Sequence, residues 1–468
     1  MIDLKSLTIE KAGEMLRKGE ITSVELAQTY LKNIEEKNKE LNAYLEVFDD
    51  VLEQAKKADG IIKNGKGAEM TGIPIAIKDN ILIKGKKCSA GSKILENHIA
   101  SYDAYVIKKL KEEGAIFLGR TNMDEFAMGS STQTSAFGVT RNPYDKERVP
   151  GGSSGGSAVA VASDMALVSL GTETCGSVRQ PASLCGLVGL KPTYGSVSRS
   201  GTIAMGNSLD QIAPFGKTTR DAEILFNVIK GKDNMDATSI TYPNIKREDK
   251  KTIGVPWHLF EVGVDEEVIK NFKESVEKLK NFGYKIKDIQ LPYSKYSLAV
   301  YYIIMPAEVS TNLSRFDGVR YGFHKEGENV ADSYKKTRSV GFGKEARRRI
   351  MLGTYVLSHG YYDAYYNKAW RVRHAIEREF ENIFKEVDYV LTPTTPTPAF
   401  KIGEKMDDPV AMYLCDIFSA PANIAGICAI ALPSGISSEG LPLSIQFMAP
   451  RFCEDSLFEI GKKFEEIK

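Results

Sequence analysis

Hydrophobic positions in the first part of the chain recur at the spacing of a helix. Thr22 and Glu25 have the spacing of a capping box, in which each side chain accepts from the other's backbone N–H. The apolar residues that follow fall on one helical face: Leu26, Tyr30, Leu31 and Ile34. The pattern predicts a helical N-terminal flank over residues 1–65.

From Ile73 onward, short β-branched runs alternate with helix-like stretches. The runs IPIAI (73–77) and AIFLGRT (115–121) are typical of strands, and residues 103–113 between them of a helix. A second portion repeats the alternation, with a strand-like IGVPW, an amphipathic helix over residues 265–282 and a strand-like YKIKDIQL. This alternation predicts an α/β domain over residues 66–468.

Two stretches differ in composition from the rest. Residues 130–205 are rich in Gly and Ser, yet apolar segments interrupt them, which indicates backbone packed tightly around a site and not a flexible linker. The stretch 231–252 is polar and rich in turn-forming residues, and it predicts a boundary or a surface excursion.

Composition narrows the functional classes. The 62 basic and 61 acidic residues leave a net charge of +1, so no overall field draws the chain onto a polyanion. The N-terminus lacks the pattern of a signal peptide and no apolar run reaches membrane-spanning length, so we expect a cytoplasmic protein without a membrane partner. The 6 cysteines show no CxxC spacing and the 5 histidines no paired spacing, which predicts reduced thiols and no metal site.

Lys78 ends an apolar strand-like run in the segment GIPIAIKDN (72–80). A lysine buried there would be poorly solvated, so its pKa would fall and a neutral amine would be available as a base near pH 7. The ordinary alternative is a strand-end lysine that packs its stem and extends its ammonium group into water.

Two serines lie in glycine-rich turns. Ser153 is in PGGSSGGS (150–157) and Ser177 is in GTETCGSVRQP (171–181). A serine is a weak nucleophile until a base removes its proton, and glycine neighbours let N–H groups converge on a developing oxyanion. Taken singly, either segment fits a structural turn. Neither is a P-loop or a GxSxG elbow, and no histidine lies in these segments, which argues against a Ser-His-Asp triad.

In this order, the three segments resemble those of the amidase signature family. The resemblance implies a large mixed, twisted β-sheet with helices on both faces. It also implies Lys78 as the base, Ser153 as the bridging serine and Ser177 as the nucleophile that forms an acyl-enzyme. The backbone amides of Thr174, Cys175, Gly176 and Ser177 would form the oxyanion hole.

Cys175 departs from the family pattern, which has glycine there. If its backbone has a positive φ, a non-glycine residue costs about 1 kcal/mol and distorts the oxyanion hole. Cys175 is also an alternative nucleophile, although no histidine is placed to activate it.

Four further segments are similar to a narrower group, the glutamine-hydrolysing A subunits of tRNA-dependent amidotransferases. They are NMDEFAMGSS (122–131), YYIIMPAE (301–308), NLSRFDGVRY (312–321) and GFGKEARRRIMLG (341–353). The resemblance implies that glutamine is held by Tyr301, Arg349 and Asp416. A guanidinium suits an α-carboxylate and a carboxylate suits an α-ammonium group.

Each of these three assignments has an alternative in the sequence. Arg349 ends a run of three arginines in which Arg348 is the strongest competitor, and Tyr302 competes with Tyr301. Asp416 lies in the apolar segment MYLCDIF, where it could also be a solvent-facing residue on a partly buried helix.

The same resemblance implies a heterotrimer with B and C subunits. The chain would supply ammonia from glutamine, and a partner protein in the complex would use ATP and Mg to convert Glu-tRNA(Gln) to Gln-tRNA(Gln). We expect no cofactor in this chain, which has no nucleotide-binding motif. The competing hypotheses are a stand-alone amidase acting on small amides and a non-catalytic scaffold.

Overall fold

A computed structural model describes residues 2–243, 245, 251–260 and 263–467. Within these residues, eleven strands form one sheet. The strands are β1 (Tyr44–Val47), β2 (Pro74–Lys78), β3 (Ile116–Thr121), β4 (Val168–Glu173), β5 (Val188–Lys191), β6 (Gln211–Gly216), β7 (Thr252–Val255), β8 (Lys285–Asp288), β9 (Tyr389–Pro393), β10 (Cys428–Ile436) and β11 (Pro442–Ala449).

The sheet is mixed, with the order β1-β3-β2-β4-β6-β5-β10-β11-β9-β7-β8. Strands β3, β2 and β4 run parallel, as do β9, β7 and β8, and the pairs between these two groups are antiparallel. Strands β2 and β4 are direct, parallel neighbours near one end of the sheet.

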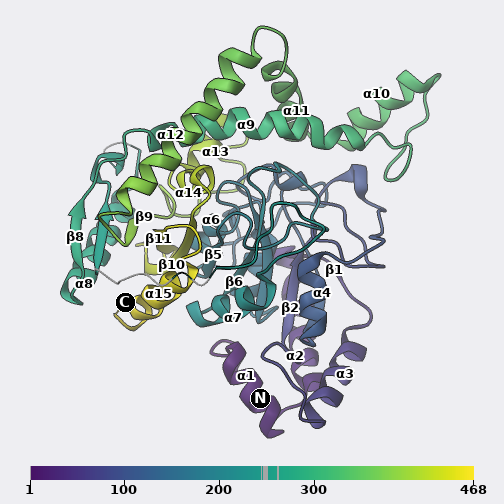
Figure 1. The fold of residues 1–468 in the computed structure, drawn as a ribbon. Helices are drawn as coiled ribbons and strands as arrows, with labels where there is room; N and C mark the ends of the chain where they lie inside the picture. Colours follow the sequence, from purple (N-terminus) through teal and green to yellow (C-terminus); the bar gives the residue numbers. More distant parts are fainter. Residues whose placement is uncertain (1, 244, 246–250, 261–262, 468) are drawn as a thin grey trace.

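Helices cover both faces of this sheet (Figure 1). They are α1 (Ile9–Lys18), α2 (Ser23–Leu41), α3 (Val51–Lys63), α4 (Tyr105–Glu112), α5 (Gly155–Ala162), α6 (Arg179–Leu184), α7 (Thr219–Ile229), α8 (Glu266–Asn281), α9 (Ser297–Asn312), α10 (Val330–Gly341), α11 (Lys344–Val356), α12 (Lys368–Ile383), α13 (Pro409–Tyr413), α14 (Ala420–Ala425) and α15 (Glu454–Ile467).

Alternate residues of the central strands enter two different cores, because successive side chains of a strand point to opposite faces. Leu391 and Ile430 pack in a core shared with α5, α7, α8 and α15. Val390 and Ala429 pack in a second core with α9, α12 and α14. The predicted mixed sheet with helices on both faces is confirmed.

Helices and strands expected from local sequence patterns are present in the structure. Thr22 caps α2 through the reciprocal capping box with Glu25, and Tyr30 and Ile34 on its apolar face are buried. The predicted strands at 73–77 and 115–121 are β2 and β3, and the helices at 103–113 and 265–282 are α4 and α8.

Residues 1–65 contain α1, α2 and α3, together with β1, which pairs with β3 at the edge of the sheet. The division into a flank at 1–65 and a domain at 66–468 stays a prediction. In the polar stretch 231–252, residues 244 and 246–250 lie outside the described part of the chain.

Candidate active site

Lys78 is the last residue of β2 and its side chain is completely buried. Its Nζ lies 2.8 Å from Ser153 Oγ, 2.8 Å from Ser154 Oγ and 2.9 Å from Thr172 Oγ1. Since β2 and β4 are adjacent and parallel, Lys78 lies beside the end of β4, which supplies Thr172. The amine is thus enclosed by three hydroxyl groups.

Burial lowers the pKa of Lys78 to about 7, against the opposing attraction of Asp124, Asp210 and Glu173. A neutral amine has two N–H donors and one lone pair. The Ser154 hydroxyl lies 3.1 Å from the Thr172 carbonyl oxygen and can donate to it while accepting from Lys78. If the second N–H of Lys78 goes to Thr172 Oγ1, its lone pair is left for the Ser153 hydroxyl.

Ser153 follows a cis Gly152–Ser153 peptide bond and is completely buried. The N–H of Asp124 donates to its carbonyl oxygen at 3.2 Å. A Cβ on Gly152 would overlap Asp124 Oδ2 and the Ser131 backbone, so only glycine fits at this close approach.

Ser177 lies beside this loop, and its carbonyl oxygen accepts from the Ser154 N–H at 3.2 Å. Its side-chain hydroxyl has no hydrogen-bond partner among the described residues, and the residue is 7% exposed where Ser153 is fully buried. The structure contains the Lys78–Ser153 hydrogen bond of the predicted relay but not one between the Ser153 and Ser177 hydroxyls.

The predicted oxyanion loop follows β4. In the described part of the chain, the N–H groups of Cys175, Gly176 and Ser177 donate to no other residue. A Cβ on Gly176 would overlap Ser419 Oγ and Asp416 Oδ1, so this position requires glycine. Three free donors in succession are the arrangement that an oxyanion needs.

Cys175 does not distort this loop. It is not among the described non-glycine residues with positive φ, so the backbone cost considered for it does not arise. Burial, together with the negative charge of Asp416, raises the pKa of its thiol well above the ordinary value. A protonated thiol is a poor nucleophile, which argues against Cys175 as the attacking group.

The buried ion pair between Glu173 and Arg179 holds the C-terminal end of the oxyanion loop. Sequence patterns alone assigned no role to either residue. Glu173 Oε1 lies 2.5 Å from Arg179 Nη2, and both side chains are completely inaccessible to solvent. Glu173 Oε2 accepts from the N–H groups of Val178 and Arg179 at 3.1 and 3.0 Å. Charged residues within the Gly- and Ser-rich segment were the available signal, because charges are buried only with partners.

Asp210 holds the N-terminal end of the oxyanion loop, and sequence patterns did not identify this residue either. Its Oδ1 accepts from Thr174 Oγ1 at 2.8 Å, and its Oδ2 accepts from the N–H groups of Met205 and Gly206. Burial raises the pKa of Asp210 to about 6.

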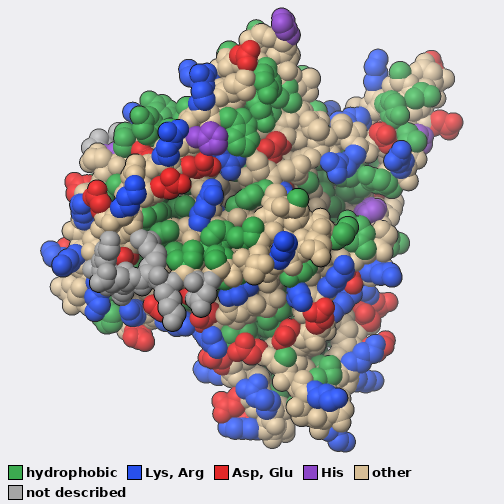
Figure 2. Space-filling view, viewed as in Figure 1, with side chains coloured by type: hydrophobic (Ala, Val, Ile, Leu, Met, Phe, Trp, Pro, Cys, Tyr) green, Lys and Arg blue, Asp and Glu red, His purple; other side chains and the backbone are tan. Residues whose placement is uncertain are grey.

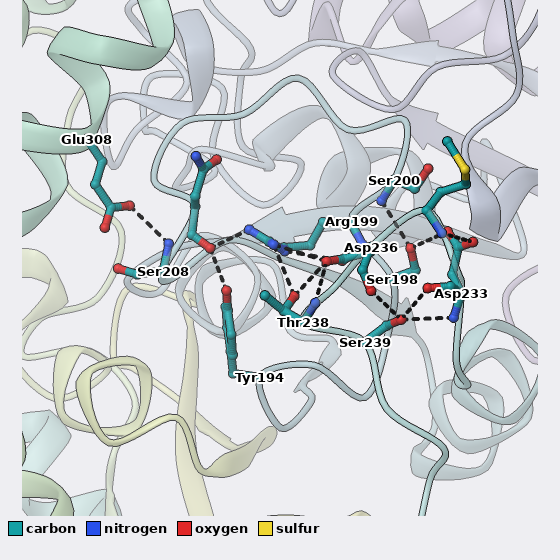
Figure 3. Close-up of polar contacts among 12 residues, drawn as sticks. Tyr194, Ser198, Arg199, Ser200, Ser208, Asp233, Asp236, Thr238, Ser239 and Glu308 are labelled. Carbon is teal, nitrogen blue, oxygen red and sulfur yellow. Dashed lines mark hydrogen bonds and ion pairs between the residues drawn. The ribbon is translucent and has the colours of Figure 1, made fainter.

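A polar network fixes the loop that carries Asp210 (Figure 3). The Arg199 guanidinium bonds Thr238 Oγ1 at 3.0 Å and pairs with Asp236 at 3.2 Å. Glu308 on α9 accepts from the Ser208 N–H at 3.0 Å. The Arg199 guanidinium also donates to the Asn207 carbonyl oxygen, so Asp236 and Thr238 of the predicted polar excursion are linked through Arg199 to the loop that carries Asp210.

Asp416 is buried and lies next to this oxyanion loop. Its Oδ2 accepts from Ser130 Oγ at 2.6 Å, while its Oδ1 has no hydrogen-bond partner among the described residues. Burial raises the pKa of Asp416 to about 7. A buried carboxylate oxygen without a partner is costly, so it marks a place where a cationic group would be bound favourably.

The structure distinguishes the three consecutive arginines. Arg349 is 2% exposed, whereas Arg347 is exposed and the Arg348 side chain is 35% exposed. Arg349 Nε donates to Glu345 Oε1 at 2.7 Å, and its guanidinium lies 5.2 and 5.3 Å from the ring centres of Tyr302 and Tyr413. Arg349 alone of the three is held inside the protein.

Tyr301 is buried on α9 and its ring packs edge-on against Tyr302 at 4.9 Å. Burial raises the pKa of its hydroxyl, and Cys175, Arg349 and Asp416 are close enough to interact with it electrostatically. Tyr302 instead stacks on Tyr413 at 3.8 Å. Cys175 and Asp416 also interact electrostatically with Tyr302, so the two tyrosines differ chiefly in that Tyr302 stacks on Tyr413.

A cavity of about 200 Å³ opens beside Arg349. Its lining includes Glu125, Ser131, Glu345, Arg348 and Tyr413. Gly343 N–H, at the start of α11, donates to Glu125 Oε2 at 2.9 Å. The cavity is thus bounded by the helix that carries Arg349 and by the loop that carries Ser130.

Within the described ranges, no three His, Cys, Asp or Glu side chains are grouped so as to hold a metal ion. A search of the same residues finds no helix with the length and apolar character to span a bilayer.

A family model described as Amidase matches residues 25–458. The A subunit of the glutamyl-tRNA(Gln) amidotransferase of Syntrophus aciditrophicus is 50% identical, and the alignment covers 99% of this chain and 98% of that protein. Its counterpart from Thermoanaerobacter pseudethanolicus is also 50% identical, with 99% and 97% covered.

Solved structures agree. The crystal structure of the A subunit of glutamyl-tRNA(Gln) amidotransferase from Thermotoga maritima is 43% identical, covers 98% of this chain and 94% of that chain, and superposes with a TM-score of 0.80. The peptide amidase PAM, solved with the inhibitor chymostatin, is 27% identical with a TM-score of 0.84, and the match covers 99% of this chain and 98% of PAM. The predicted family resemblance is thereby confirmed: the chain belongs to the amidase family, and within it to the group of glutamyl-tRNA(Gln) amidotransferase A subunits.

Proposed function

We propose that the chain hydrolyses glutamine and supplies the ammonia with which an amidotransferase converts Glu-tRNA(Gln) to Gln-tRNA(Gln). The observation that carries this proposal is the fully buried Lys78–Ser153 hydrogen bond beside the unpaired hydroxyl of Ser177. The full-length relatives, which are named as the A subunits of glutamyl-tRNA(Gln) amidotransferases, support the substrate.

The chemistry begins with a proton transfer. Lys78 accepts the proton of Ser153, which in turn accepts the proton of Ser177, and Ser177 Oγ attacks the side-chain amide carbon of glutamine. The carbonyl electron pair moves onto oxygen, where the N–H groups of the 174–177 loop stabilise it. The carbon–nitrogen bond then breaks as Lys78 returns its proton through Ser153 to the departing nitrogen, which leaves as ammonia.

The second half of the reaction reverses the roles. Water attacks the carbonyl carbon of the Ser177 ester, its proton passes through Ser153 to Lys78, and a second oxyanion forms in the same hole. The bond between this carbon and Ser177 Oγ then breaks, Ser177 Oγ takes the proton back from Lys78 through Ser153, and glutamate leaves. A base with a pKa of about 7 suits both halves, because it can accept and return a proton at neutral pH.

Glutamine would be recognised by three side chains. Glu345 engages Nε of Arg349, and Nη1 has only the weak acceptor Met305 Sδ at 3.8 Å, so the Nη groups would bind the α-carboxylate. The unpartnered Oδ1 of Asp416 accepts the α-ammonium group, which favours the ionised form of this carboxyl and lowers its pKa on binding. Tyr301 would contact the same substrate, because its hydroxyl is close enough to Arg349 and Asp416 to interact with both electrostatically.

We further propose that the chain acts in the cytoplasm in a heterotrimer with B and C subunits, in which a partner uses ATP and Mg and provides most of the tRNA contact. The net charge of +1 supports a minor role in tRNA binding. Exposed apolar side chains around the turn between α11 and α12, at the top of Figure 2, offer a surface for a partner. They are Met351, Tyr355, Tyr361, Tyr362 and Tyr365.

The test compares ammonia release from glutamine and from simple aliphatic amides, with the full chain and with Ser177→Ala. The expected result is a strong preference for glutamine that is lost with Ser177→Ala. A preference for simple amides would favour a stand-alone amidase. An unchanged rate of tRNA amidation with glutamine in the Ser177→Ala complex would leave only a scaffold.

A further inference from the structure

Ser419, at the start of α14, contacts the oxyanion loop through its side chain. Its hydroxyl donates to the Cys175 carbonyl oxygen at 2.6 Å, and the residue is completely buried. A second acceptor, the Asp416 carbonyl oxygen, lies farther away at 3.1 Å. The main interaction of this hydroxyl is therefore with the peptide that joins Cys175 to Gly176.

The geometry of a peptide bond turns this contact into a constraint. In a trans peptide, the carbonyl oxygen and the following N–H point in opposite directions. Holding the Cys175 oxygen on Ser419 directs the Gly176 N–H away from α14, and this N–H donates to no other described residue. Without that anchor the peptide could turn over and present a carbonyl oxygen to the developing oxyanion.

The absence of a side chain at Gly176 makes the contact possible. A Cβ there would overlap Ser419 Oγ, so glycine lets the serine approach the peptide closely. Backbone flexibility is the accompanying cost of glycine, and a peptide next to it turns over more easily than others. Gly176 lets Ser419 approach the loop, and the flexible peptide beside Gly176 therefore needs a contact such as that of Ser419 to fix its orientation.

Ser419 is itself held in place. Its own carbonyl oxygen accepts from Arg179 Nη2 at 2.8 Å, and Arg179 is paired with Glu173 at the other end of the loop. The Ser419 N–H donates to the Asp416 carbonyl oxygen at 3.2 Å. One turn thus supports the oxyanion loop and carries the carboxyl group that faces the substrate.

We propose that Ser419 is a positioning residue for the oxyanion hole: its hydroxyl holds the Cys175–Gly176 peptide with the Gly176 N–H facing the reacting carbonyl oxygen. The inference rests on the proposed function, because it concerns the rate of the Ser177 reaction. It adds a requirement outside the Lys78, Ser153 and Ser177 triad.

The test is Ser419→Ala in the full chain, assembled with its partner subunits, with ammonia release from glutamine measured. Deleting one oxyanion donor outright costs about 100- to 1,000-fold in kcat, so loss of its anchor should lower kcat by about 10- to 100-fold. KM should stay within about twofold, since the ground-state carbonyl needs the hole far less than the oxyanion does.

A ligand pair separates positioning from general damage. The aldehyde analogue of glutamine adds Ser177 Oγ to its carbonyl carbon and so places an oxygen in the oxyanion hole, whereas glutamate does not. Ser419→Ala should weaken the aldehyde by the same factor as kcat and leave glutamate binding unchanged. Equal weakening of both ligands would mean that the substitution damages the site as a whole, and it would overturn the proposal.

Ser196→Ala is the matched control. Ser196 is also completely buried and its hydroxyl also donates to a carbonyl oxygen, that of Thr193, at 2.8 Å. It should change thermal stability by a similar amount without changing kcat. If Ser419→Ala does not fold, Ser419→Cys places a weaker donor at the same position, and the smaller loss of kcat should again occur with glutamate affinity retained.

The proposed function and the role of Ser419 can be refuted separately. If the complex releases no ammonia from glutamine and Ser177→Ala changes nothing, the proposed function is wrong and the inference falls with it. If Ser177→Ala abolishes ammonia release while Ser419→Ala leaves kcat within about twofold, only the role of Ser419 is wrong.

Discussion

Replacing Lys78 by Met tests whether this lysine is held as a neutral amine. The substitution removes a group whose pKa is lowered from 10.5 to about 7 by burial, while a side chain of similar length keeps the site filled. Ammonia release should be lost because the base is lost. The informative quantity is the difference in unfolding free energy between the native chain and Lys78→Met as pH changes.

The sign and size of that change follow from the two pKa values. Between about 7 and 10.5 the unfolded chain binds one more proton at Lys78 than the folded chain does, so raising the pH stabilises the native protein relative to Lys78→Met. At 1.36 kcal/mol per pH unit, with partial titration near the lower limit, the difference should change by about 2.5 kcal/mol between about pH 7.5 and about pH 9.5.

Denaturant unfolding of both proteins at the two pH values measures this difference, and other titrating groups cancel because both chains share them. Lys191→Met is a matched comparison, since Lys191 is also fully buried with a pKa lowered to about 7. It should show the same linkage while keeping the Lys78 base. A native-to-Lys78→Met difference that does not change with pH would refute a neutral Lys78.

Four further outcomes follow from the site. Burial raises the pKa of Asp416 to about 7 and lowers that of Lys78 to about 7. Because both groups must lose a proton, a plot of log(kcat/KM) for glutamine should rise with pH below 7 with a slope approaching about two. Asp416→Asn should reduce this slope to about one. Arg349→Lys should raise KM for glutamine by about 10- to 100-fold and leave amides without an α-carboxylate unaffected, as steady-state kinetics would show. Gly176→Ala should lower kcat by at least about 100-fold, because its Cβ would collide with Ser419 and Asp416; wild-type rates would contradict the packing described. Cys175→Ala should keep kcat within about threefold, and its loss of acyl-enzyme formation with glutamine would reinstate the thiol as nucleophile.

Local pattern predicted the sheet segments because each signal is contained in a few neighbouring residues. The run IPIAI ends at Lys78, and such a lysine can be buried or can extend its ammonium group into water. The pattern left both open, and the structure shows that Lys78 is buried. Its proximity to Ser153 could not be predicted from spacing, since it depends on which strands become neighbours.

The residues that support the site were missed because their partners are distant in sequence. Ser419 lies 244 positions from Cys175, and the hydrogen bond between them leaves no periodic trace in either segment. Asp210 and Glu173 are single acids in otherwise ordinary strand and turn sequences. A charged residue in such a segment indicates that a partner exists, but only the structure shows which N–H and hydroxyl groups each buried carboxylate accepts from.

The oxyanion loop is the feature through which these separate contacts act together. Asp210 binds its beginning at Thr174, Ser419 binds its middle at Cys175, and Glu173 binds its end at Val178. A loop fixed at three points by buried partners has little freedom left to reorganise during the reaction, which is the condition under which N–H groups stabilise an oxyanion most strongly. Asp416 lies on the same turn as Ser419, whose N–H donates to the Asp416 carbonyl oxygen. One turn therefore carries both the carboxylate proposed to bind the α-ammonium group and the hydroxyl proposed to orient the oxyanion loop, and the two groups can be tested separately because they are different side chains.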